Sequence, residues 1–221
     1  MIKADETDGR RRRGDRARGQ ILTHSRMIAS AEGLDGLSLG RVAAEAGVGK
    51  SNIQILFGDK EALQLATLEN AVGLYHDTVV TPALAAANPL GRLRALVDGW
   101  YDFVENRVLP GGCFINAVSS EYRTRPGRIR DRINDFRRAA RTRLRQLIRD
   151  AKDCGEFFPD VDEAQLVFDL VACQAVANVA ALMDDAEEFA RARQTSRDRI
   201  QAAIAIAIVT DTDKGGPSNR R

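Results

Sequence analysis

The chain has few of the side chains that build disulfide frameworks and metal sites. Its three cysteines, Cys113, Cys154 and Cys173, are odd in number, lie far apart and form no CxxC pair. This spacing excludes a disulfide framework and a zinc motif. The two histidines, His24 and His76, stand outside any cluster with ligand spacing. We therefore expect reduced thiols in a core or pocket, ordinary helix histidines, and no metal or cofactor.

Long apolar runs and strand patterns are also scarce. No continuous apolar run is long enough to cross a bilayer, and the N-terminus is charged where a signal peptide would be apolar. The 221 residues include only six prolines and few alternating β-branched runs, which favours an all-α protein. With 44% hydrophobic residues, the chain can bury one core, or form a small domain joined to a larger one. We expect a cytoplasmic protein with no membrane partner.

Catalytic patterns are missing as well. The sequence contains no glycine-rich phosphate loop and no spaced pair of nucleophile and base, so we predict that the protein is not an enzyme. Asp98, Asp102 and Glu105 share one face of an expected helix over residues 90–107, and a solvated helix surface explains them. The alternative hypothesis is a helical small-molecule carrier or enzyme in which any helical hairpin is structural.

Charge is present but unevenly distributed, although the net charge is only +2. Residues 9–26 hold seven arginines and one aspartate, and residues 123–152 hold twelve basic and three acidic residues. Residues 153–188 hold ten acidic and no basic residues. The last two blocks nearly balance, so we favour their mutual neutralisation on folding or across a dimer over a second nucleic-acid surface.

Two short helical patterns meet across a glycine turn in residues 38–57. Ser38 is a good N-cap for a first helix that ends at Gly47. Gly49 then precedes a second helix from Lys50. With Ile53 and Leu56 facing inward, the side chains that this second helix presents to solvent are Lys50, Ser51, Asn52 and Gln54.

This hairpin is typical of a helix-turn-helix, whose second helix lies in the major groove with its N-terminal residues at base edges. A side-chain amide can both donate to and accept from adenine. Asn52 and Gln54 are therefore our candidates for base contacts, with Lys50 and Ser51 on bases or phosphates. A hairpin with a glycine turn also occurs in plain helical bundles, so spacing alone leaves a structural role open.

A set of residues between Ile21 and Leu63 carries a family resemblance. Its members are Ile28-Ala29, Ala31, Gly33, Leu37-Ser38, Val42-Ala43, Ala46-Gly47-Val48, Ile53, Phe57 and Lys60-Glu61-Ala62-Leu63. Together they resemble the N-terminal domain of the TetR family of bacterial one-component regulators. The chain departs from the family at Gln54, where Tyr is usual, and at Ile55, where His is frequent. The family's aromatic DNA contact is therefore not carried over, and beyond Leu63 only helical layout and length are similar.

The resemblance implies a helix-turn-helix DNA-binding domain followed by a helical ligand-binding and dimerisation domain. We place the first at residues 20–65 and the second at 66–210. Ser38, Arg41 and Lys60 are our candidates for the DNA backbone, Lys60 by resemblance, and Gly49 completes the DNA-binding set. Residues 1–19 should form a disordered basic arm, which we favour as a DNA contact over a solubilising tail. Residues 211–221 should form a disordered tail.

Helical periodicity predicts the remaining elements. The expected helices span about residues 18 or 20 to 32, 60–80, 90–107, 113–122, 127–153, 161–183 and 187–209. Aromatic residues concentrate in the helices over 90–107 and 113–122, which indicates either plain core or an apolar pocket of roughly 300–1,000 Å³. The candidate ligand contacts are Trp100, Phe103, Val104, Phe114, Val118, Tyr122, Phe136 and Gln174. Such a pocket suits a small hydrophobic or aromatic effector.

The last two expected helices have more apolar surface than one chain can cover. Residues 166–182 are almost wholly apolar, and Ile200, Ile204 and Ile208 follow in the next helix. This surplus predicts a homodimer whose two helix pairs form a four-helix bundle. Gln174 and Asn178 need partners there, either across the two-fold axis or on a ligand. Such a dimer reads a pseudo-palindromic operator if its recognition helices lie about 34–36 Å apart. The resemblance to TetR regulators implies a repressor, and we expect its release when a ligand shifts the helix over 60–80.

Overall fold

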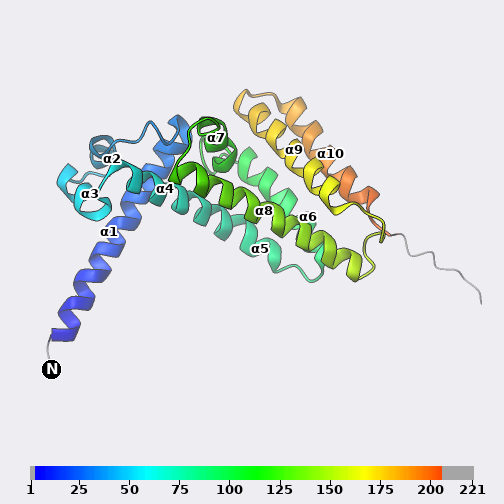
Figure 1. The fold of residues 1–221 in the computed structure, drawn as a ribbon, viewed down its shortest axis with the longest axis horizontal. Helices are drawn as coiled ribbons and strands as arrows, with labels where there is room; N and C mark the ends of the chain where they lie inside the picture. The colour runs from blue at the N-terminus through cyan, green and yellow to red at the C-terminus, as the bar shows by residue number, and fades with distance from the viewer. Residues whose placement is uncertain (1–2, 206–221) are drawn as a thin grey trace, which may run out of the picture.

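The computed structural model describes residues 3–205, with side chains from Gly14 onward. Over this range the chain consists of helices and turns, with one isolated antiparallel β-bridge between Phe157 and Ile204 and no β-strand. The expected all-α fold is confirmed. Figure 1 shows the N-terminal helices at one end of an elongated molecule and the C-terminal helix pair on its far side.

The N-terminal unit consists of α1 (Lys3–Glu32), α2 (Leu39–Glu45) and α3 (Lys50–Phe57). Helix α1 begins far earlier than expected, so residues 3–19 are helical where a disordered arm was predicted. Extending an existing helix adds one backbone hydrogen bond per residue without a new nucleus. The Arg18 guanidinium donates to the Leu56 carbonyl at 2.6 Å and lies 4.3 Å from the Phe57 ring centre, which fixes this part of α1 against α3.

A long, bulged helix joins the two ends of the molecule. It consists of α4 (Lys60–Tyr75), the π-helical turn η1 (His76–Val80) and α5 (Thr81–Leu84). We expected this helix to end near residue 80, but it continues through Pro82. Proline lacks an N–H and its ring meets the carbonyl four residues earlier, here that of Thr78. Thr78 lies within the wider π turn, which accommodates the proline without ending the helix.

The C-terminal unit contains α6 (Pro89–Glu105), α7 (Phe114–Glu121), α8 (Arg128–Asp153), α9 (Glu163–Leu182) and α10 (Ala186–Ala202). The side chains of Asn88, Asp162 and Asp185 cap α6, α9 and α10. These bounds lie close to the expected ones except at the end of α10, which stops before the predicted residue 209. Ile208 and the tail over 211–221 lie outside the described residues.

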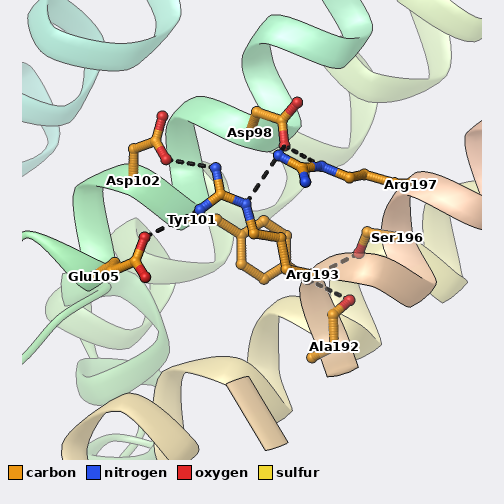
Figure 2. Close-up of polar contacts among 8 residues, drawn as sticks. All are labelled: Asp98, Tyr101, Asp102, Glu105, Ala192, Arg193, Ser196 and Arg197. Atoms are coloured by element: carbon orange, nitrogen blue, oxygen red, sulfur yellow. Dashed lines mark hydrogen bonds and ion pairs between the residues drawn. The ribbon is translucent and has the colours of Figure 1, made fainter. Parts of the chain in front are cut away.

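Helix α10 is fixed to α6 by one arginine and one tyrosine (Figure 2). Arg193 pairs with Asp102 at 2.5 Å and Glu105 at 3.0 Å, and lies 3.7 Å from Asp98. These acidic residues were expected to be solvated, but α10 supplies their partners. The buried Tyr101 hydroxyl lies 3.0 Å from the Ala192 carbonyl and 2.8 Å from the Ser196 hydroxyl.

The basic residues of α8 are neutralised in more than one place. At its C-terminal end, Arg149 and Lys152 pair with Glu163 at the start of α9, as the charge blocks suggested. At its N-terminal end, Arg128 and Arg132 pair instead with Glu61 and Glu69 of α4. The balance between residues 123–152 and 153–188 is therefore only partly a set of direct contacts.

Helix α9 is apolar on two sides. Its inner side packs on α6, α8 and α10. Among the described helices it alone is long and apolar enough to cross a membrane, although Asp169 on it pairs with Arg199 of α10. Its outer side leaves Phe168 66%, Val179 59% and Met183 75% exposed. These residues follow at helical spacing, so α9 presents one continuous uncovered apolar face.

Candidate DNA-binding face and ligand cavity

The hairpin of α2 and α3 is held by buried residues from both helices. Val42 and Ala43 of α2 and Ile53 and Phe57 of α3 are buried. The turn between the helices passes through Gly47, whose φ of 65° is open to glycine but costly for other residues. This packing therefore holds α3 so that the side opposite Ile53 and Phe57 faces solvent.

The exposed side of α3 carries the predicted base-reading residues. Lys50, Ser51, Asn52 and Gln54 are all exposed. Ile55, noted above as a departure from the family pattern, is 81% exposed beside them. An apolar side chain can contact a thymine methyl group in the major groove. The geometry therefore leaves amide, hydroxyl, ammonium and apolar groups available on one face.

The candidates for the DNA backbone are already engaged within the protein. The Ser38 hydroxyl caps α2 by accepting from the Arg41 backbone N–H at 3.2 Å. The Arg41 guanidinium forms a bidentate ion pair with Glu32, which raises its pKa. The Lys60 ammonium donates to the Asp35 carbonyl at 2.9 Å. Gly49 is the N-cap of α3 and has no side chain to offer.

A cavity of about 390 Å³ lies among α4, α6, α7, α8 and α9. Five of the eight predicted ligand contacts line it, namely Trp100, Phe103, Phe114, Phe136 and Gln174. The wall is mostly apolar and aromatic, with Tyr75 packed edge-on against Phe103 at 5.5 Å between ring centres. Its size falls within the range typical of small-molecule sites.

Three predicted contacts do not reach the cavity. Val104 and Val118 are buried in the surrounding core, one helical turn beyond the cavity residues Trp100 and Phe114. Tyr122 lies past the end of α7, where its hydroxyl is 3.5 Å from Gln64 and 3.4 Å from Asp35. Its role is therefore at the junction with the N-terminal unit.

Several cavity residues were missed by the sequence analysis. They include Tyr75 and His76 from the bulged helix, Cys113 and Asn116 near the start of α7, Phe168 of α9, and Arg137, Arg141 and Arg143 of α8. The apolar residues Phe136, Ala140 and Leu144 form a stripe at helical spacing along α8 and also line the cavity. The arginines next to that stripe were assigned to charge balance because helical periodicity does not show where a cavity begins.

Burial shapes the ionisation of the cavity residues. It raises the pKa of the Tyr75 hydroxyl and of the Cys113 thiol. Both groups therefore remain neutral near pH 7, and Cys113 lacks the lowered pKa of a reactive thiol. Burial, and after it the charge of Arg137, lowers the pKa of Arg141.

Helix α7 connects the cavity to the DNA-binding end. Phe114, Asn116 and Ser119 line the cavity. At the other end of the helix, the Glu121 carboxylate accepts from the backbone N–H groups of Leu34 and Asp35, which lie between α1 and α2. Helix α7 therefore contacts both the cavity and the segment that leads into α2.

A second contact joins the two units through the segment before α7. The Gly111 N–H donates to the Ser30 hydroxyl of α1 at 2.9 Å, and a Cβ at Gly111 would lie 1.9 Å from the Ser30 carbonyl oxygen. Asn178, proposed as a dimer or ligand contact, instead accepts from the Cys113 backbone N–H at 2.6 Å. Gln174 lines the cavity, so the two amides have different surroundings.

Solved structures with the same fold are regulators. A TetR transcriptional regulator from Chloroflexus aurantiacus is 22% identical, with a TM-score of 0.80, over 87% of this chain and 98% of that chain. A TetR-family regulator from Cytophaga hutchinsonii is 20% identical, with a TM-score of 0.78, over 88% and 98%. A regulator from Saccharomonospora viridis, solved in complex with choline, is 23% identical, with a TM-score of 0.73, over 86% and 98%. At these identities the likeness shows the fold.

Sequence comparison identifies the family. No curated protein sequence matches the chain significantly. The family model described as bacterial regulatory proteins of the tetR family matches residues 21–67, which hold the hairpin. The model described as a tetracyclin repressor-like C-terminal domain matches residues 89–196, which hold most of the cavity. The two matches together span more than half of the chain, and the chain belongs to the TetR family of transcriptional regulators.

Proposed function

We propose that the protein is a ligand-responsive repressor that binds a pseudo-palindromic operator as a homodimer and is released by a small hydrophobic molecule. The observation that carries this proposal is the double role of α7. Its first turns line the cavity, and its last residue, Glu121, holds the backbone that leads into α2. Because α7 connects the cavity to the helix-turn-helix, a ligand bound in the cavity can control DNA binding.

The bulged helix offers a second connection between ligand and DNA. Tyr75 and His76 line the cavity near its middle, while Gln64 and Lys60 near its start bind the Leu34 and Asp35 carbonyls. A ligand that favours one position of this helix changes the spacing of two recognition helices in a dimer. The two dimer shapes need differ in ligand affinity by only a few kcal/mol for such a shift.

The dimer contact is assigned to α9 and α10. Phe168, Val179 and Met183 belong to one continuous exposed apolar face on α9. Apolar residues on the surface of a monomer are normally scattered singly, so a continuous face indicates a contact site. Two copies of the α9–α10 pair would cover it as a four-helix bundle. We expect Val179→Glu to convert the dimer to a monomer by mass and to abolish operator binding. Leu84→Glu, at an exposed apolar residue of α5, is the matched control.

DNA contacts are assigned to the exposed side of α3. Asn52 and Gln54 read base edges, and Lys50 and Ser51 contact bases or phosphates. Arg41 and Lys60 reach phosphates by exchanging their partners Glu32 and Asp35 for DNA. Replacing Asn52 and Gln54 by Ala should bring operator affinity close to that for random DNA. An undiminished preference for the operator would refute the base-reading roles.

The proposal is tested with the DNA directly upstream of the protein's own gene. We expect that duplex to bind about a thousandfold tighter than an unrelated duplex at matched salt. Equal binding that simply collapses with salt would mean nonspecific attraction to arginines. That result would favour the alternative function, a helical small-molecule carrier or enzyme. A regulator of this kind acts in the cytoplasm, where its DNA is.

A further inference from the structure

The polar groups of the cavity wall have one sign of charge. Arg137, Arg141 and Arg143 of α8 all line it, and no aspartate or glutamate is among its lining residues. The wall also contains His76 and the uncharged side chains of Asn116, Ser119 and Gln174. The permanently charged side chains in the wall of this apolar cavity of about 390 Å³ are therefore all cations, and all of them come from α8.

These arginines lack acidic partners among the residues that the structure describes. Asp135, the carboxylate nearest to them in sequence, is taken by Arg132 and Arg138. Within the described part of the chain, the Arg141 guanidinium makes one long contact, of 3.5 Å, with the Arg137 carbonyl. Other α8 arginines, such as Arg128 and Arg149, do reach carboxylates on α4 and α9. The three at the cavity differ from them in both position and pairing.

Without a bound anion, the positive charges of these arginines are energetically unfavourable in the folded protein. Arg137 and Arg141 stand one helical turn apart, where like charges repel. Both are half-buried in a wall that also contains aromatic residues, and a charge removed from water requires a paired group. Arg143 lies close enough to Tyr75 for its charge to act on that hydroxyl. Guanidinium groups hold carboxylates in bidentate geometry, which would satisfy this wall.

We propose that the effector is an amphipathic anion, a carboxylate with an apolar body, whose charged group binds Arg137, Arg141 and Arg143. The apolar body lies against Trp100, Phe103 and Phe114. This inference rests on the proposed function and specifies the ligand of the same cavity. It separates the chain from its structural relative solved with choline, because choline is a cation.

A quaternary ammonium is the opposing candidate, because the aromatic wall could hold a cation through its ring faces. Three arginines in the same wall would repel it. The two candidates are distinguished by probes with one alkyl body and different head groups. Octanoate, octan-1-ol and octyltrimethylammonium serve this purpose, with choline itself as a fourth probe.

The chain carries its own reporter for the measurement. Trp100 is its single tryptophan, and it lines the cavity. Its fluorescence in the full-length protein, without DNA, gives the affinity of each probe. We expect octanoate to bind at least about tenfold tighter than octan-1-ol, because charge-assisted hydrogen bonds are stronger than neutral ones. Octyltrimethylammonium and choline should bind more weakly than the alcohol.

Two variants show whether the arginines cause the preference. Arg141→Gln should reduce octanoate affinity about tenfold and leave octan-1-ol affinity unchanged. Arg145→Gln is the matched control, because Arg145 is an exposed arginine on the same helix outside the cavity. Circular dichroism of each variant shows that the fold is kept.

Three results would overturn the anionic effector. They are equal affinities of the neutral and anionic probes, tighter binding of the cationic ones, or no binding of any probe. Failure of the repressor proposal is distinguishable, because it requires loss of preference for the upstream DNA, which the fluorescence measurement does not involve. Octanoate binding in a protein without that preference would support the carrier hypothesis instead.

Discussion

Glu121 of α7 accepts a hydrogen bond from the Leu34 backbone N–H at 2.9 Å, although 86 residues of chain lie between them. The same carboxylate accepts from the next N–H, that of Asp35, at 2.8 Å. Backbone donors in this segment have no helix partner of their own, since α1 has ended and α2 has not begun. One side chain therefore stabilises the entry to the helix-turn-helix.

Removal of this carboxylate should uncouple the two units. We expect Glu121→Ala to lower the free energy of unfolding by about 1–3 kcal/mol, because two backbone donors lose a charged acceptor. Operator binding should weaken, and the effect of a ligand on it should decrease. Chemical denaturation and DNA titration measure these changes. Ser120→Ala, at the exposed neighbouring position, should leave both unchanged.

Gly111 should tolerate no side chain. A Cβ there would lie 1.9 Å from the Ser30 carbonyl oxygen, so α1 or the segment before α7 must move. We expect Gly111→Ala to cost more than about 2 kcal/mol of stability. Gly73→Ala in α4 is the contrasting variant, because nothing lies within 4 Å of its Cβ position. It should stabilise the protein by about 0.5–1 kcal/mol in the same denaturation experiment. Equal effects of the two changes would contradict the close approach.

Acid should weaken the ion pair between Asp35, which precedes α2, and Arg125, which follows α7. The hydrogen bond from Arg125 lowers the pKa of the Asp35 carboxyl below its ordinary 3.8. A carboxyl with a lower pKa in the folded state stabilises the fold above its unfolded pKa, and this contribution disappears as the pH falls through the folded pKa. Wild type should therefore be more stable than Asp35→Asn near pH 7, with the difference shrinking below about pH 4. A difference independent of pH would exclude the ion pair as its cause.

The attachment of α10 to α6 should depend on Tyr101. Tyr101→Phe removes the hydroxyl that contacts the Ala192 carbonyl and the Ser196 hydroxyl, both otherwise enclosed. We expect a loss of about 1–2 kcal/mol in unfolding free energy and a weaker dimer. Burial raises the pKa of Tyr101 to about 12, so its phenolate absorbance should appear well above pH 10 in the folded protein. Tyr101→Phe should reduce the amplitude of this late rise in an absorbance titration, to which the buried Tyr75 also contributes.

The periodic parts of the fold were predictable from sequence. Ser38 and Gly47 indicated the hairpin, and the bounds of α6, α8 and α9 were close to those expected. The exceptions have physical causes. Helix α1 continues through a polar segment that lacks periodicity because extension needs no new nucleus. A π turn carries the chain past Pro82, and no periodic pattern predicts one.

The cavity was predicted only in part. Aromatic residues at helical spacing indicated Trp100, Phe103, Phe114 and Phe136, but the same reasoning included Tyr122, which lies at the junction. Side-chain type is a good predictor of burial. It is a poor predictor of which buried residues line a cavity. The arginines of α8 were missed for the complementary reason, since charge suggests solvent. Only the arrangement of five helices shows that Arg141 faces the cavity.

Helix α6 is occupied on two sides, and this limits how the protein can diversify. Trp100 and Phe103 belong to the cavity wall, while Asp98, Tyr101 and Asp102 anchor α10 (Figure 2). Substitutions on α6 that alter the ligand site therefore also disturb the attachment of α10. The cavity residues contributed by α8 and α9 include four small, exposed alanines, namely Ala139, Ala140, Ala172 and Ala175. New effector specificities should accordingly arise by changes in α8 and α9, and a saturation library should find far more tolerated variants there than in α6.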